Sequence, residues 1–339
     1  MRAGTEWLGP PILAVLTLAM PDRAAAQGIE VDLAGLALEN AELFVQPLTR
    51  GLGFAMATGL FDGAEPLGRF GFDVGARVSA ALPPAEAETF SAVLPSSIKW
   101  NRPGLGPKTY QNSYQARGGS SRTPTVVGAG EGVVLEPAGE FRSELLHGGE
   151  NPADYEIRFP EGLDIPGVPF LVVHASVGLG FGTELSFRFI PEIEVDQEVG
   201  GVRARGFSGR HAVSTWFSSP IDVALVFGSQ KLEVGDYLEA SSTQYGVVVE
   251  HGLGPLSLFI SGIARTAEVD ISYSVENPSD NPGLPQDGFE IAFHEDLDSG
   301  VALGAGARLS LLFMNLTGQY VLDDYNGFSL KVGFGAGRR

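Results

Sequence analysis

The sequence contains no cysteine. A disulfide framework, a thiolate metal site and a cysteine nucleophile are therefore all excluded. Positive charge is also scarce, with 22 Lys and Arg against 41 Asp and Glu and a formal net charge of −19. Because nucleic-acid binding needs a basic face, this balance argues against a nucleic-acid partner. An acidic surface is ordinary for an exported protein and identifies no ligand by itself.

Long apolar runs are missing beyond the N-terminus. Hydrophobic residues make up 44% of the chain. After the N-terminal segment, however, no apolar run approaches the roughly 20 residues that a membrane helix needs. The apolar residues instead lie in short alternating segments separated by Gly, Pro, Asn and Asp. A membrane β-barrel distributes its apolar residues in this way.

The N-terminus has the pattern of a signal peptide. Arg2 supplies a positive charge, Trp7–Met20 is mostly apolar, and Ala24–Ala26 provides a small-residue cleavage site. We therefore predict that residues 1–26 direct export through the secretory pathway. A membrane anchor is the alternative, although the apolar core is short for a span. No cysteine follows the predicted cleavage site, which excludes a lipoprotein.

Residues 27–48 form the next predicted segment. Apolar residues recur at spacings of three and four between Leu33 and Phe44, which is typical of a short amphipathic helix, and Pro47 is predicted to end it. We interpret this segment as a plug or cap at the periplasmic mouth of a barrel. A leader without regular structure before the first strand is the alternative.

Residues 49–339 are predicted to form the barrel. In Arg69–Ala80, apolar residues occupy one parity and Arg, Gly, Asp and Ser the other, which places the two sets on opposite faces of a sheet. Gly51–Phe61 shows a similar alternation, and the pattern returns at Val168 and holds to the end of the chain. Residues 95–167 lack it. We expect long loops there, with weak strands near 132–135 and 155–159.

The links between the predicted strands alternate in length. Gly180–Thr183, Ser218–Pro220 and Gly252–Pro255 are short, whereas Asp196–Gly201, Glu233–Ala240 and Glu276–Ser299 are longer. Outer-membrane barrels have short periplasmic turns and longer outer loops.

We therefore predict an all-β fold in the outer membrane: an antiparallel transmembrane β-barrel of about 12–14 strands with a short N-terminal helical plug or cap. In Leu256–Val275 the apolar parity changes near Gly262, which predicts a β-bulge. A soluble, secreted β-sandwich is the alternative, because its strands also alternate, with the apolar face inward.

Motifs for catalysis or cofactor binding are not found. The five histidines have no metal-site spacing, and neither a nucleotide-binding loop nor a hydrolase nucleophile elbow occurs. We expect no enzymatic activity, cofactor or metal. The acidic stretch Glu276–Asp298 offers carboxylates that suit Ca²⁺, but it matches no EF-hand loop, and a solvated loop is the preferred interpretation.

Charged residues on the polar parity of the strands are the candidate functional residues. We predict that they line the lumen: Asp73, Arg77, Glu184, Arg188, Glu192, Arg308 and Lys331. Opposite charges can cross-link and close a narrow lumen, or they can line a polar path through it. The direction of Arg265 is left open, because this residue follows the parity change.

Several segments carry a family resemblance. They are AELFVQPL at Ala41–Leu48, GLGF from Gly51, GLF from Gly59, FGFDV from Phe70, GVVVE from Gly246, and Leu303–Leu312. Together they resemble an uncharacterised family of bacterial outer-membrane barrels that is distantly similar to long-chain fatty-acid transporters of the FadL type. The resemblance implies a barrel with a plug-like N-terminal segment and passage of hydrophobic molecules. It fixes no functional residue.

Two functions follow as hypotheses. The first is passive transport of small or hydrophobic molecules. The second is a non-transporting surface barrel with a structural or binding role, suggested by the predicted loops at 95–167 and 276–299. The expected partners are outer-membrane lipid, the barrel assembly machinery and a small or hydrophobic ligand. The chain ends on Arg339, with Phe334 as its last aromatic residue, and thereby departs from the usual aromatic ending of such barrels.

Overall fold

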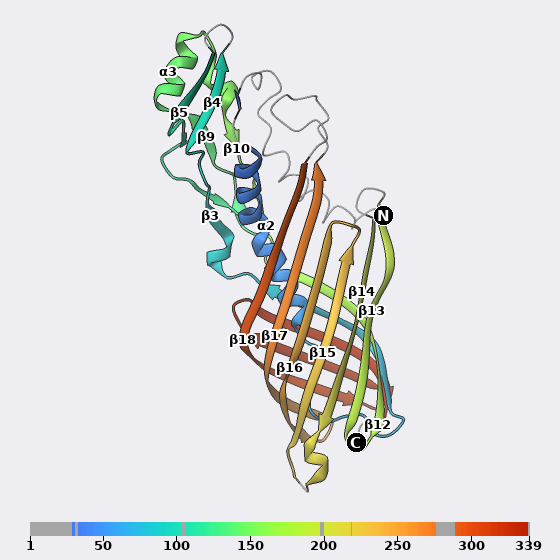
Figure 1. Ribbon diagram of the computed structural model, residues 1–339. Coiled ribbons are helices and arrows are strands. Elements are labelled where there is room, and N and C mark those ends of the chain that lie inside the picture. Colours follow the sequence, from blue (N-terminus) through green and yellow to red (C-terminus); the bar gives the residue numbers. More distant parts are fainter. Residues whose placement is uncertain are drawn as a thin grey trace, which may run out of the picture. The chain divides into compact units, whose positions relative to one another are not determined.

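A computed structural model describes residues 29–30, 33–102, 106–196, 200–217, 219–275 and 289–337. The predicted signal peptide lies outside these residues. The chain divides into two compact units (Figure 1). The inserted unit comprises the residues up to Leu48, Ala85–Ile165 and Ser272–Phe293, and the barrel unit comprises Thr49–Pro84, Pro166–Ile271 and His294–Arg339.

The barrel unit is a closed antiparallel β-barrel in which the strands follow one another in sequence order. Its strands are β2 (Phe72–Leu82), β12 (Val168–Gly180), β13 (Thr183–Asp196), β14 (Gly200–Ala212), β15 (Asp222–Val234), β16 (Leu238–Leu253), β17 (Leu256–Val275), β18 (Phe289–Leu311), β19 (Met314–Leu322) and β20 (Asn326–Ala336). Pairing of β2 with β20 closes the ring, from Phe72 opposite Ala336 to Leu82 opposite Asn326.

The two faces of the wall differ as the alternation predicts. On β20, Leu330 and Phe334 are 57% and 51% exposed, whereas Ser329 and Lys331 between them are 1% and 3% exposed. Exposed apolar side chains occupy outward positions on the other barrel strands as well. A transmembrane barrel has this apolar outer belt, whereas a β-sandwich turns its apolar rows inward. The predicted transmembrane β-barrel is confirmed, and the β-sandwich alternative is wrong.

The two ends of the barrel have different connections. At the short-turn end, two-residue links join β12 to β13, β16 to β17 and β18 to β19. At the opposite, long-link end, residues 83–167 connect β2 to β12.

The regular alternation predicted for the link lengths is wrong in detail. The link after β15 is only Gly235–Tyr237, and the link predicted to be short around Ser218–Pro220 extends over 213–221 and contains η3 (Val213–Trp216).

The N-terminal helix is longer than predicted. Helix α2 (Leu33–Ala57) contains Pro47 and continues for ten residues beyond it. The strand predicted over Gly51–Phe61 is therefore wrong: its first part is helical and the remainder is irregular. Among the described residues, none of the helices has the length and apolar character needed to cross a membrane.

Residues 49–71, here called the lumen segment, pass through the barrel. Near the long-link end, the ring of Phe54 stacks on Tyr325 at a centroid distance of 5.1 Å. Near the short-turn end, the backbone N–H of Gly68 donates to Gly337 O at 2.7 Å, and that of Phe70 donates to Gly178 O at 2.9 Å. The segment enters at the long-link end and reaches the short-turn end, from which β2 runs back within the wall. The residues inside the barrel therefore follow the segment 27–48, for which the plug or cap was predicted.

The barrel has ten strands, fewer than the 12–14 predicted. Two segments account for the difference, because residues 51–61 occupy the lumen and residues 85–165 belong to the inserted unit. The bulge predicted near Gly262 is also wrong, since β17 pairs with β16 in one continuous register. The apolar parity changes there because the lumen-facing side chains become apolar, as with Ile263 and Val269.

The inserted unit has its own core, which corrects the expectation of long loops over 95–167. It includes α2 up to Leu48 and the helices α3 (Gly139–His147), η1 (Ala85–Glu88) and η2 (Pro152–Tyr155). Two of its small sheets have three strands: β1 (Ile29–Glu30), β4 (Ser97–Arg102) and β5 (Gly106–Gln111) form one, and β6 (Tyr114–Ala116), β9 (Val134–Pro137) and β10 (Ile157–Arg158) form the other. Two further sheets have two strands, β3 (Thr89–Ser91) with β7 (Arg122–Pro124) and β8 (Ala129–Gly130) with β11 (Gly162–Leu163). Aromatic rings fill the core, and Trp100 and Tyr155 pack edge-on against Phe141. Burial raises the pKa of the Tyr114 hydroxyl, which donates to Tyr155 O at 2.9 Å.

Candidate functional site in the barrel lumen

The lumen segment places irregular backbone inside the barrel. After α2 ends at Ala57 the chain forms no helix or strand until Phe72, yet Leu60, Ala64 and Leu67 are buried. A buried peptide group without a hydrogen-bond partner costs free energy. The lumen-facing side chains of the wall must therefore supply partners for this stretch.

Cationic and amide side chains of the wall donate hydrogen bonds to the carbonyl groups of the lumen segment. Arg210 on β14 donates through Nη1 to Gly63 O at 2.7 Å, and Arg308 on β18 donates through Nη1 to Asp62 O at 3.2 Å. The carbonyl groups of Gly59 and Met56 accept from Arg188 and Gln230, respectively. Positive charge in the lumen is thereby directed at the carbonyl oxygens of the lumen segment.

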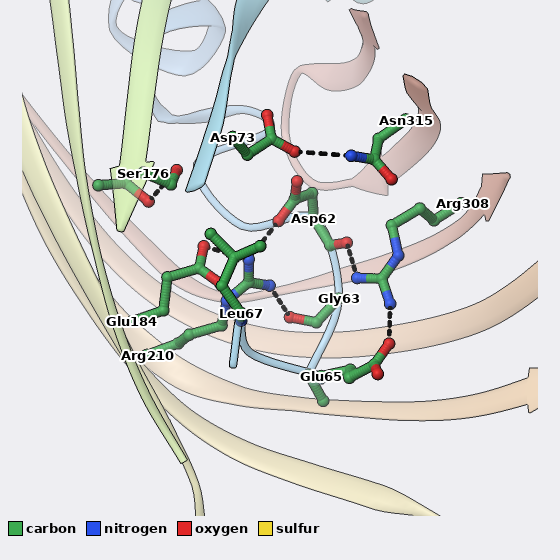
Figure 2. A network of polar contacts seen from close by, with 12 residues as sticks. Asp62, Gly63, Glu65, Leu67, Asp73, Ser176, Glu184, Arg210, Arg308 and Asn315 are labelled. Carbon is green, nitrogen blue, oxygen red and sulfur yellow. Dashed lines mark hydrogen bonds and ion pairs between the residues drawn. The ribbon is translucent and has the colours of Figure 1, made fainter. Parts of the chain in front are cut away.

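Carboxylates of the wall accept hydrogen bonds from the backbone N–H groups of the lumen segment. Glu250 on β16 accepts through Oε2 from the N–H of Ala64 at 2.6 Å and of Glu65 at 2.8 Å. Glu184 on β13 accepts from the N–H of Leu67 at 2.8 Å, a contact near the centre of Figure 2. The lumen needs both signs of charge because a peptide backbone presents both donors and acceptors.

Ion pairs connect these groups to one another. Arg210 bridges Glu184 at 2.5 Å and Asp62 at 2.9 Å, and Arg308 bridges Glu65 at 2.7 Å and Glu250 at 2.6 Å. Figure 2 shows the two guanidinium groups on either side of the lumen segment. Each arginine therefore holds the segment and a wall carboxylate together.

Asp62 occupies the middle of this network. Its carboxylate lies 2.9 Å from Arg210 Nη2, 2.5 Å from Lys331 Nζ and 3.9 Å from Arg77 Nη2. These cations come from β14, β20 and β2. Because β2 and β20 form the closing seam of the barrel, Asp62 joins both sides of that seam.

A second group surrounds Asp73 on β2. Its carboxylate accepts from Asn315 Nδ2 at 3.0 Å and lies 3.0 Å from His174 Nε2 and 3.2 Å from Lys331 Nζ. Lys331 thus connects the Asp73 group to Asp62.

Helix α2 is held near the long-link end by a separate set of contacts. The Arg265 guanidinium lies 4.6 Å from the centroid of the Phe54 ring, whose other contact is the stacked Tyr325. Arg265 also pairs with Asp323, and Arg50 Nε lies 2.6 Å from Glu295 Oε1. The helix entering the lumen is therefore fixed by aromatic packing and by charge.

The structure brings six of the seven predicted charges into the lumen. Their exposed fractions are 0% for Asp73, 4% for Arg77, 1% for Glu184, 5% for Arg188, 1% for Arg308 and 3% for Lys331.

The seventh, Glu192, is exposed on β13, so its predicted place in the lumen is wrong. The register of β13 against β14 shifts between Ile190 and Ile193, and such an irregularity changes which side chains face inward.

Several members of the network were not predicted. Arg210 and Glu250 share the parity of buried polar neighbours, Ser208 on β14 and Ser242 on β16, so parity alone could have identified them. Asp62 carried no such signal, because Asp-Gly at this point is typical of a hairpin turn.

A small cavity lies beside the lumen segment. It has a volume of about 20 Å³, with Gln244, Ser261 and Gln319 among its lining residues. This volume holds about one water molecule. No group of three or more His, Asp and Glu side chains suited to a metal ion occurs in the part of the chain that the structure describes. Of the acidic stretch predicted as a solvated loop, residues 276–288 lie outside that part.

Fold and lumen together define a transmembrane β-barrel that is plugged by its own N-terminal segment. By sequence, the chain belongs to a family of unknown function, DUF6588, whose model matches residues 10–336. No curated protein matches it.

Solved structures with similarity to this chain include several barrel proteins. The β domain of the Bordetella autotransporter BrkA is 11% identical, with 78% of this chain and 98% of that chain covered and a TM-score of 0.30. OmpT of Vibrio cholerae, in a loop-deletion mutant, is 10% identical, with 78% and 98% covered and a TM-score of 0.24. An anion-selective porin from Comamonas acidovorans is 12% identical, with 79% and 98% covered and a TM-score of 0.21. The FadL-type similarity inferred from the sequence stays a prediction.

Proposed function

We propose that this protein is an outer-membrane barrel whose lumen is sealed by its own chain and which serves as a membrane anchor for the inserted unit. The observation that carries this proposal is the lumen segment itself. The backbone of this segment forms hydrogen bonds with the charged wall side chains that would otherwise line a polar path. The cavity beside the segment holds about one water molecule. A structural or binding role therefore fits the geometry better than an open pore.

Electrical conductance tests the seal. Purified protein in planar lipid bilayers is expected to be silent at moderate voltage. Asp62→Asn leaves Arg210 and Lys331 facing a neutral side chain in place of their shared carboxylate, and we expect it to produce transient openings. Asp236→Asn, in the exposed turn Gly235–Tyr237, is the matched control and should remain silent. A steady open conductance of the wild-type protein would contradict the proposal.

A reversible lock can show that the openings arise from the lumen segment. A Cβ atom built on Gly327 lies 3.3 Å from the Thr58 Cβ, close to the roughly 3.5–4.5 Å that disulfides span. Because the chain has no cysteine, Thr58→Cys with Gly327→Cys introduces one possible disulfide. In the Asp62→Asn background, oxidation should abolish the openings and reduction should restore them.

Passive transport of small or hydrophobic molecules is the second candidate. One observation favours it: the lumen segment carries Leu60 and Phe61 into an apolar cluster with Phe259 and Ile263 of β17. Departure of the segment would uncover an apolar wall in the lumen. In this case, vesicles containing the protein would take up a fluorescent fatty acid, and oxidation of the double variant that carries the reversible lock would stop the uptake. Equal uptake by locked and reduced protein would rule out a route through the lumen.

A further inference from the structure

The turns at the short-turn end carry large apolar side chains at their tips. These residues, here called the apolar rim, are exposed by 78% (Phe70), 86% (Phe181), 67% (Trp216), 68% (Phe217), 101% (Leu312) and 64% (Phe313). Tight turns that project into water normally carry Gly, Asn or Asp. The rim thus has a composition that turn chemistry does not explain.

The backbone makes this choice of residues more unusual. Phe70, Phe181 and Leu312 have φ angles of 63°, 51° and 51°. This left-handed region is sterically unfavourable for bulky side chains and favours glycine or asparagine. Unfavourable backbone conformations that persist in a structure often mark a functional contact. A contact that favours apolar side chains would explain why bulky apolar residues occupy these turn tips despite their unfavourable backbone conformation.

The rim continues the apolar belt of the barrel on several strands, although Arg69 lies beside Phe70, with its guanidinium 4.9 Å from the centroid of that ring. Phe313 stacks on Phe334 of β20 at a centroid distance of 6.4 Å, and Phe334 is an outward belt residue that is 51% exposed. Phe72, at the start of β2, follows Phe70, and Leu179 of β12 precedes Phe181; both are exposed outward, at 53% and 49%. The same surface therefore extends from the belt into the turns.

The long-link end differs. There the exposed outward positions become charged, as at Glu194 on β13, Arg205 on β14, and Glu268 and Asp270 on β17. The apolar surface is thus displaced along the barrel towards the short-turn end. Because the belt is the lipid-facing surface of a transmembrane barrel, continuity with the belt indicates lipid as the partner of the rim.

We propose that the apolar rim is a lipid-binding surface that inserts into the headgroup and upper acyl region of the leaflet at the short-turn end. Aromatic side chains, and Trp in particular, favour this region, because their apolar rings leave water while polar groups stay near the headgroups. The apolar side chains of the rim then lie in the leaflet, while polar residues of the same links, such as Ser219, stay at its aqueous surface. The inference is independent of whether the lumen conducts.

Spin labelling tests the proposal, and the absence of cysteine allows one label per variant. Nitroxides are attached at Phe313→Cys and, separately, Phe181→Cys in the rim. Reference labels are attached at Phe227→Cys, an outward belt position on β15, and at Glu268→Cys. The full-length protein is reconstituted in phosphatidylcholine and phosphatidylglycerol vesicles. Collisions with oxygen, which concentrates in lipid, are compared with collisions with a water-soluble nickel chelate.

We expect the oxygen-to-nickel ratio at both rim positions to exceed that at residue 268 severalfold and to lie below that at residue 227. A rim ratio equal to that at residue 268 would place the turns in water and overturn the proposal. Low accessibility to both reagents would indicate a covering protein surface and would overturn it as well. Brominated lipids should quench the fluorescence of Trp216, measured as the difference between the wild-type protein and Trp216→Phe. This measurement needs no spin label, so it remains valid if a cysteine variant misfolds.

Discussion

Glu250 makes three contacts in the lumen, and a carboxylate oxygen is the acceptor in each of them. Its Oε2 accepts from two backbone N–H groups, and its Oε1 lies 2.6 Å from Arg308 Nη2. In Glu250→Gln the amide oxygen can still accept from the backbone, but the amide nitrogen then faces a guanidinium donor. Removing one member of a buried ion pair typically costs about 3–5 kcal/mol. We expect Glu250→Gln to lower the free energy of unfolding in detergent micelles by about 3 kcal/mol, measured by denaturant titration.

Glu239 provides the matched control on the same strand. It pairs with Lys231 at 2.7 Å, but its side chain is 52% exposed on the outer face. Exposed pairs contribute little to stability, because water screens them. Glu239→Gln should therefore have a small effect. Equal losses in the two variants would mean that the lumen network contributes no special stability.

The alternation of polar and apolar residues predicts the lumen charges wherever the register is continuous. It places Asp73, Glu184 and Arg308 in the lumen because each lies on an uninterrupted two-residue repeat. It fails at Glu192, where an irregularity between Ile190 and Ile193 follows from strand pairing that the sequence of β13 alone does not reveal. The lumen-segment partners of these charges could not be predicted either, because Asp62 and Glu65 lie where Asp-Gly indicated a turn between two strands.

At the scale of elements, Phe54 holds the entry of α2 into the barrel. Its ring lies between the Arg265 guanidinium and the Tyr325 ring, and it is 5% exposed. Phe54→Ala removes both contacts and leaves a cavity, a change that typically costs about 3–5 kcal/mol. Because the loss falls on the lumen segment, we expect amide hydrogen exchange over residues 49–57 to accelerate well before the strands exchange.

Phe227→Ala is the control for this experiment, since this ring lies on the outer face of β15 and is 45% exposed. It should leave the exchange of residues 49–57 unchanged. If Phe54→Ala instead accelerates exchange uniformly over helix and strands, the helix and the wall unfold as one cooperative unit.

The same helix shows why sequence periodicity was misleading. A helix that is half-buried shows a 3.6-residue repeat, but from Gly51 to Ala57 the helix is surrounded by the wall and has no solvent-facing side. Its small residues instead mark close approaches: a Cβ atom on Gly51 would lie 2.5 Å from Val168 Cγ2, and one on Gly53 would lie 2.5 Å from Leu297 Cδ1. Gly or Ala at every second position therefore produced the two-residue repeat that is typical of a strand. Pro47 was also misleading, because the helix continues past it.

At the scale of the whole molecule, the outward rows of residues 168–337 predict the barrel well, because lipid contact imposes one simple repeat on each strand. No comparable repeat describes residues 85–165, whose core is assembled from short strands and aromatic rings such as Trp100 and Phe141. The sequence therefore indicated the class of fold but overestimated the number of strands.

The threading of the lumen segment makes the topology of the chain testable. Outer-membrane barrels turn their short links towards the periplasm, so we expect the long-link end to face the outside. Residues 83–167 leave the barrel from that end. Because the chain has no cysteine, Glu150→Cys in the inserted unit and Ser219→Cys in the link between β14 and β15 at the short-turn end each give one thiol at an exposed position. A membrane-impermeant maleimide should label residue 150 on intact cells and residue 219 only after the outer membrane is permeabilised. Labelling in the reverse order would place the inserted unit in the periplasm and remove the basis for a surface role.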